Sequence, residues 1–122
     1  MKQEEKDLLL KDICGRLPYN VVINCKNEDS NYNCYLTTDI IKELQCNKEY
    51  YEYKPYLIPI PSMTEEQCEE LYYISEIRIS FTIDRLIEVY KNTIEWFLKN
   101  HIDYNNLIGK DLAIDATGLN IY

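Results

Sequence analysis

The chain lacks several residue patterns on which common kinds of functional site depend. Only 3 of its 122 residues are glycine, too few for a glycine-rich phosphate-binding loop. It has 1 histidine, and none of its 5 cysteines forms a Cys-x-x-Cys pair, so the usual zinc-binding spacings are missing. No apolar run approaches the ~18 residues of a membrane-spanning helix. We therefore expect no metal, no other cofactor and no membrane partner.

Basic residues are also scarce. The chain has 13 lysines and arginines against 21 aspartates and glutamates, a formal net charge of -8. A protein this acidic repels phosphates, so we expect no direct binding to nucleic acid. The excess acid gathers in the segment 61–76, which includes Glu69 and Glu70 and has no basic residue. Such a cluster also suits an acidic mimic of nucleic acid that inhibits a host DNA-binding protein, and we keep this as an alternative function.

The length fits one compact domain over residues 1–122, long enough to bury a core without metal or disulfide support. The first residues, MKQEEKDLLLKD, carry charges where a secretion signal is apolar, so we expect a cytoplasmic location. In that reducing compartment the five cysteines should stay free thiols. Cys25 and Cys34 are the pair for which a bond is most easily imagined, because they share one face of a predicted hairpin.

Periodicity predicts an α+β domain: a small antiparallel β-sheet packed against an N-terminal helix and a long helix in the C-terminal half. Apolar residues recur at helical spacing over 3–16 and 82–100. Between them, the β-rich runs NVVINCK and NYNCYLTT flank the polar KNEDSN, which is typical of a β-hairpin. A tight turn about Asp29 and Ser30 sets Cys25 opposite Cys34, and a four-residue loop is the alternative. We interpret 39–47 as a strand, although a short helix capped by Thr38 fits too. Residues 76–81 are predicted as a short strand or extended link.

The most distinctive segment is KPYLIPIPSMTEEQ, residues 54–67. Proline fixes φ and keeps the preceding residue extended, so this arm should be stiff, and its prolines argue against a central strand beyond Pro55. Thr64 and Gln67 have the spacing of a capping box, which predicts a helix start at Thr64. Tyrosines cluster beside the arm, as they do at many interfaces.

We therefore predict a partner-binding site on this arm. Its members are the exposed edge and the glutamates of the following helix: Tyr53, Tyr56, Ile58, Ile60, Glu69 and Glu70. An arm already ordered by proline loses little entropy on docking to another protein or to a second copy of this chain. The competing interpretation is that the arm turns inward and closes the core.

Three segments carry a family resemblance: LLLKDICGRLPYNV, KPYLIPIPSMTEEQ and NHIDYNNLIGKDLAID. Together they resemble a family of small uncharacterised proteins encoded by gut bacteria and their bacteriophages. In that family a glycine stands where this chain has Asn20, and both residues tolerate the left-handed conformation. The resemblance implies a phage or mobile-element context, and it carries no activity, ligand or catalytic residue.

Candidate catalytic residues are few. His101 and Asp103 could pair as a base and its orienting acid, with Cys14 or Cys68 as nucleophile, which makes a small hydrolase using His101 a second alternative. A histidine just after a long helix is more often a partner of the helix dipole. The leading expectation is a non-enzymatic protein–protein interaction or regulatory module, such as a host-interaction or anti-defence adaptor, whose partner is a host protein, a phage protein or a second copy.

Overall fold

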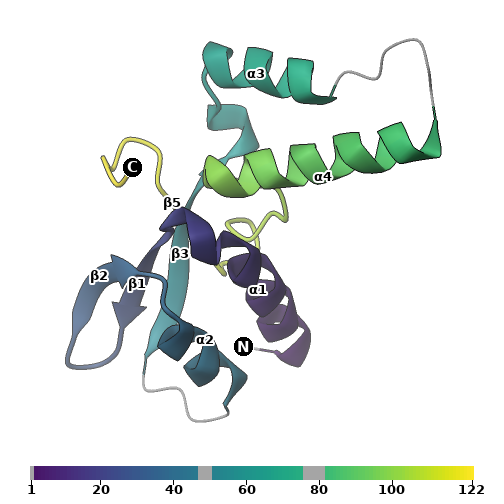
Figure 1. Cartoon of the computed structure of the whole chain (residues 1–122). Coiled ribbons are helices and arrows are strands. Elements are labelled where there is room, and N and C mark those ends of the chain that lie inside the picture. Colours follow the sequence, from purple (N-terminus) through teal and green to yellow (C-terminus); the bar gives the residue numbers. More distant parts are fainter. Residues whose placement is uncertain (1, 47–50, 76–81) are drawn as a thin grey trace.

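The computed structural model describes residues 2–46, 51–75 and 82–122, and the predicted α+β class is confirmed (Figure 1). The helices of these ranges are α1 (Gln3–Arg16), α2 (Thr38–Gln45), α3 (Glu65–Ser75) and α4 (Ile83–Lys99). The strands are β1 (Val22–Lys26), β2 (Asn31–Tyr35), β3 (Glu52–Pro59), β4 (Ile102–Asp103) and β5 (Ile114–Asp115). The extended segment predicted at 76–81 lies outside the described residues.

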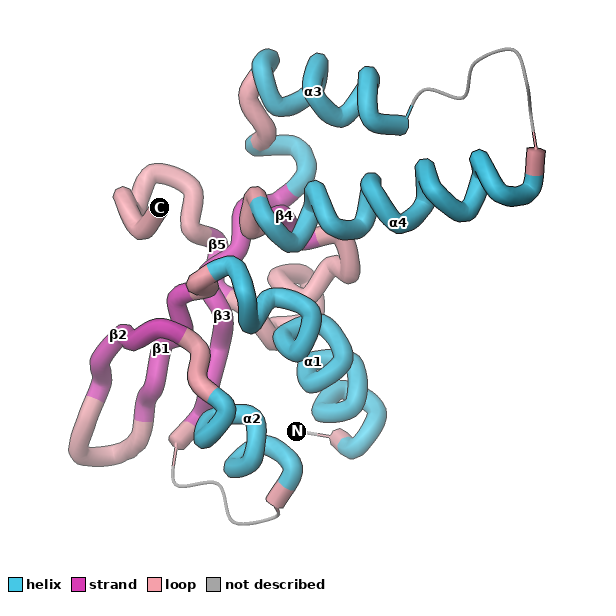
Figure 2. Tube along the Cα trace, in the orientation of Figure 1, coloured by secondary structure: helices cyan, strands magenta, loops and turns pink. Residues whose placement is uncertain are grey.

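The sheet is antiparallel in its larger part and parallel at one end of β3. Strands β2, β1 and β3 form an antiparallel ladder in that order, whereas the two-residue strands β4 and β5 run parallel to β3 (Figure 2). The antiparallel sheet predicted from the sequence is thus extended by two short parallel strands that the C-terminal region supplies.

The first part of the proline-rich arm, up to Pro59, lies in β3, an interior strand of this sheet. The peptide between Leu57 and Ile58 is bonded on both sides, since Ala116 N donates to Leu57 O and Ile58 N donates to His101 O, each at 2.8 Å. The sequence argument against a central strand was therefore wrong. Pro55 is the last residue of the ladder with β1, and the parallel pairings begin beyond it, so its missing N–H falls where the strand changes partners.

The hairpin closes through a four-residue loop rather than the tight turn. Asn27 N donates to Ser30 O, and the Asn27 side-chain oxygen accepts from the backbone N–H groups of Asp29 and Ser30. Ile23 therefore lies opposite Cys34, two positions away from the predicted register. A shift of two keeps every side chain on its predicted face, because strand side chains alternate with a period of two.

The strand predicted over 39–47 is wrong, because helix α2 covers all but the end of that segment. Residue 47 lies outside the described residues. Thr37, in extended conformation, caps α2 by accepting from Ile40 N. Ile40 and Leu44 are both buried, and four residues is one helical turn, so the same apolar pair satisfies helix and strand patterns alike. The Thr37 cap distinguishes the two patterns, because it stabilises the start of a helix.

The core lies between the sheet, α1, α2 and the loop after β4. Its buried cluster comprises Leu9, Ile13, Val21, Ile23, Cys25, Leu36, Ile40, Leu44, Tyr53, Leu57, Leu107, Leu112 and Ala113. No residue of α4 belongs to this cluster. Figure 1 shows α4 crossing the end of α1 and extending away from the sheet beside α3. These two helices form a projection, which we call the α3–α4 projection.

A buried ion pair ties α1 to the β4 region. Arg16 donates to both carboxylate oxygens of Asp12, at 2.5 and 3.2 Å, and to Ile102 O at 2.7 Å. Asn105 donates to Asp12 at 2.8 Å. The Arg16 guanidinium also lies over the Tyr104 ring. Both charged side chains are fully buried, so their partners are essential to the fold.

Candidate interaction surface

The predicted docking edge on the proline arm is largely inside the protein. Tyr53 and Tyr56 are buried, Ile58 is half-buried and only Ile60 is exposed. The Tyr53 hydroxyl donates to Glu43 of α2, and the Tyr56 hydroxyl donates to Asn33 at 3.0 Å. The competing interpretation, in which the arm closes the core, is correct for these two tyrosines.

The glutamates of the predicted site do lie at the surface. Glu69 and Glu70 are exposed on α3, as are Glu65 and Glu66 in its first turn. Thr64 and Gln67 form the predicted capping box, with reciprocal hydrogen bonds of 3.1 and 3.0 Å. Because the tyrosines belong to the core and the glutamates to the α3–α4 projection, the six predicted residues do not form one surface.

His101 and Asp103 are not arranged as a catalytic pair. Both oxygens of Asp103 accept backbone N–H groups, from Leu107 at 2.8 Å and Ile108 at 3.0 Å, so this carboxylate holds the loop that follows it. The His101 ring stacks on Tyr122 with centroids 3.6 Å apart. Burial, with a smaller effect of the Arg16 charge, lowers the pKa of His101 to about 4, so the imidazole is neutral at physiological pH.

The candidate nucleophiles Cys14 and Cys68 and the other aspartates of the C-terminal region are dispersed. Asp111 pairs with Lys54 at 3.0 Å, and Asp115 accepts from the N–H of Thr117. Cys14 and Cys68 are exposed on different helices. Within the ranges that the structure describes, no three His, Cys, Asp or Glu side chains gather in a way that suits a metal ion.

Four large apolar side chains instead line an exposed face of α4. Ile83, Leu86, Ile87 and Tyr90, which we call the α4 stripe, are 73, 40, 47 and 68 % exposed. Their spacing of three and four residues puts them on one side of the helix. The sequence predicted this amphipathic face, but we expected it to pack on the sheet.

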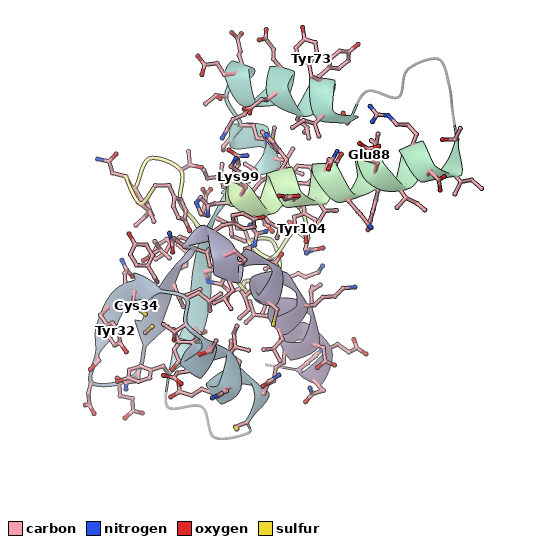
Figure 3. The ribbon with its side chains drawn as sticks, viewed as in Figure 1. Tyr32, Cys34, Tyr73, Glu88, Lys99 and Tyr104 are labelled. Carbon is pink, nitrogen blue, oxygen red and sulfur yellow. The ribbon has the colours of Figure 1, made fainter. Side chains whose placement is uncertain are left out.

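The buried side of α4 is a different side from the stripe. Val89 and Trp96 are the buried residues of α4, and seven residues bring the helix back to nearly the same direction. Leu71 and Ile74 of α3 are half-buried. Tyr73, in contrast, is on the side of α3 that points away from α4 (Figure 3). Helix α3 thus contacts α4 and leaves the stripe open.

A groove between α1 and α4 continues the stripe. It has a volume of about 440 Å³ and is lined by Leu8, Lys11, Tyr90, Lys91, Ile94, Glu95, Leu98, Tyr104 and Asn105. Tyr90 belongs to both the groove and the stripe. Beneath the far end of α4, Tyr104 stacks on Phe97 at 5.4 Å and closes the groove (Figure 3). The apolar surface thus runs along α4 from the tip of the α3–α4 projection to the body of the protein.

Comparison with known proteins finds no family model, no curated protein and no solved structure that matches the chain. None of the helices that the structure describes is long and apolar enough to cross a membrane. Function is therefore inferred from the surface of the chain and from its sequence.

Proposed function

We propose that this chain is a non-enzymatic protein-interaction module whose binding surface is the α4 stripe and the adjoining groove. The observation that supports this is the line of four large apolar side chains, at least 40 % exposed, on one projecting helix. Single exposed apolar residues are ordinary, whereas a contiguous exposed apolar patch is typical of an interaction site. An enzyme is not favoured, because Asp103 is occupied by backbone N–H groups and His101 by stacking.

The resemblance to phage and gut-bacterial proteins supports a biological setting for this module. We propose that it acts in the cytoplasm as a host-interaction or anti-defence adaptor. A helix that presents an apolar face beside a groove is a common way to recognise another helix. The partner would therefore present an amphipathic helix.

The test compares two tyrosines of similar exposure. Tyr90 of the stripe is 68 % exposed and Tyr35 on β2 is 63 % exposed, so Tyr90→Glu and Tyr35→Glu make the same chemical change at two sites. Tagged wild type and both variants are used to capture proteins from host lysate, followed by mass spectrometry. We expect Tyr90→Glu to lose the partners that wild type and Tyr35→Glu retain. Equal capture by both variants would overturn the proposal that the stripe binds a host protein.

The exposed glutamates of α3 favour one second candidate, an acidic mimic of nucleic acid. Four carboxylates on one short helix provide the charge that such a mimic needs. A mimic predicts capture of a DNA-binding protein that is weakened by added salt and by Glu69→Gln with Glu70→Gln. The stripe proposal predicts that this double variant still captures its partner.

A further inference from the structure

We propose that the α4 stripe binds a second copy of this chain, in an antiparallel arrangement with a twofold axis beside Ile87. This rests on the proposed function, since it names the partner of the same surface. A twofold contact requires a surface that is complementary to itself. Both the apolar residues and the charges along α4 meet that requirement.

The apolar residues are placed almost symmetrically, because the midpoint of Ile83 and Tyr90 falls between Leu86 and Ile87. Ile83 lies four residues before Ile87 and Tyr90 three residues after it. When two antiparallel copies of α4 meet at Ile87, the Ile83 side chain of one copy therefore lies near the Tyr90 ring of the other, on both sides of the axis. The Leu86 and Ile87 side chains of both copies meet at the centre. Every member of the stripe then has an apolar neighbour.

The charges beside the stripe fix the direction. Asp84 and Lys91 are both exposed and are seven residues apart, so they lie along the same edge of the stripe, two turns from each other. Their midpoint falls next to Ile87. An antiparallel pair therefore puts Asp84 of each copy opposite Lys91 of the other. In a parallel pair this edge of the two helices would lie on opposite sides of the contact, so Asp84 and Lys91 would not meet.

The contact is small. The stripe runs from Ile83 to Tyr90, about 12 Å of helix, so the contact covers little more than two turns of each copy. Each copy also carries a net charge of -8, which opposes association at long range. We therefore expect a reversible dimer that depends on protein concentration and is best observed near 0.15 M salt, where the Debye length is about 8 Å.

The test measures molar mass over a range of protein concentrations, by sedimentation velocity on the full chain. Wild type should shift from monomer to dimer as its concentration rises. Ile87→Asp should stay monomeric, because the axis would bring two carboxylates together in an apolar contact. Tyr35→Asp, a change to an exposed residue on β2, should dimerise like wild type. Circular dichroism of Ile87→Asp should match wild type, since Ile87 is half-exposed.

The direction is tested by exchanging the charges. Asp84→Lys and Lys91→Asp should each weaken the dimer roughly fivefold or more, since each turns two attractive pairs into repulsive ones. Combining both substitutions in one chain should restore dimerisation. Weakening by the single variants without restoration by the double variant would contradict the antiparallel register.

The outcomes separate this inference from the proposed function. A wild type that stays monomeric throughout would overturn self-association, and so would an Ile87→Asp variant that dimerises normally. If Tyr90→Glu still loses a captured host protein in that case, the stripe is an interaction surface for a different partner. If neither association nor capture depends on the stripe, both proposals fail.

Discussion

Removal of one partner from the buried ion pair should be among the most damaging single changes in this protein. We consider Asp12→Ala on α1. Arg16 is 0 % exposed and Asp12 is 1 % exposed, so no water can replace the lost carboxylate without local opening. In the variant the buried Arg16 guanidinium keeps its hydrogen bond to Ile102 O but loses those to Asp12. The variant also removes the carboxylate that accepts a hydrogen bond from Asn105.

The expected loss follows from these contacts. Breaking a buried ion pair by removing one member costs about 3–5 kcal/mol, because the remaining charge stays buried and uncompensated. A chain of this length has a total stability of roughly 6–18 kcal/mol. The variant should therefore lose a large share of its stability and could be partly unfolded at 37 °C.

Urea denaturation followed by far-UV circular dichroism measures this loss. Asp7→Ala is the matched control, because Asp7 is an exposed aspartate of the same helix that accepts a hydrogen bond from Gln3 on the surface. It should change the free energy of unfolding by no more than about 0.5 kcal/mol. The double variant Asp12→Leu with Arg16→Met should be more stable than Asp12→Ala, because it leaves no buried charge. A loss below about 1 kcal/mol for Asp12→Ala would refute the reasoning.

Three further predictions concern single groups. The fold lowers the pKa of His101 from 6.5 to about 4. The resulting stability should be fully present above pH 6.5 and decline by at most about 3 kcal/mol as the pH falls toward 4. In urea titrations at a series of pH values, His101→Asn should flatten this dependence. Thr64→Ala should lower the free energy of unfolding by ~0.5–2 kcal/mol through loss of the α3 cap, and Thr64→Ser should retain most of that stability. Cys25 and Cys34 have sulfur atoms 3.4 Å apart without a bond, so denatured, unreduced protein should yield all five thiols on titration. A yield of three would contradict this, and a yield restored to all but one thiol in Cys34→Ser would identify this pair as the oxidised one.

The sequence could predict the elements whose signals are local. The capping box at Thr64 and the α4 cap at Thr82 act within one helical turn, and both are present. Asn20 adopts φ 55°, the left-handed conformation expected where the resembled family has glycine. The hairpin register was missed by two residues because it depends on how Asn27 bonds the loop, and loop length was left open by the pattern.

The candidate site was less predictable, because periodicity shows which residues share a face but not what covers that face. The stripe on α4 has the pattern of a core-facing helix, yet α3 covers a neighbouring side and the sheet is already covered by α1 and α2. The buried ion pair did leave a signal. Asp12 and Arg16 are one turn apart, and Asp12 adjoins Ile13 of the buried α1 face.

The proline-rich strand allows the predicted docking edge and the observed core to be separated by experiment. Tyr53 is 4 % exposed in the interior strand, whereas Ile60 is 49 % exposed just beyond it, although the sequence placed both in one site. Tyr53→Ser should cost ~2–5 kcal/mol, because it removes a buried ring and the hydroxyl that contacts Glu43. Ile60→Ser should cost less than about 1 kcal/mol, because the side chain is half in water already. Urea denaturation of the two variants side by side measures this contrast. A stable Tyr53→Ser would mean that the strand does not close the core, and the docking edge would then regain its place as a candidate surface.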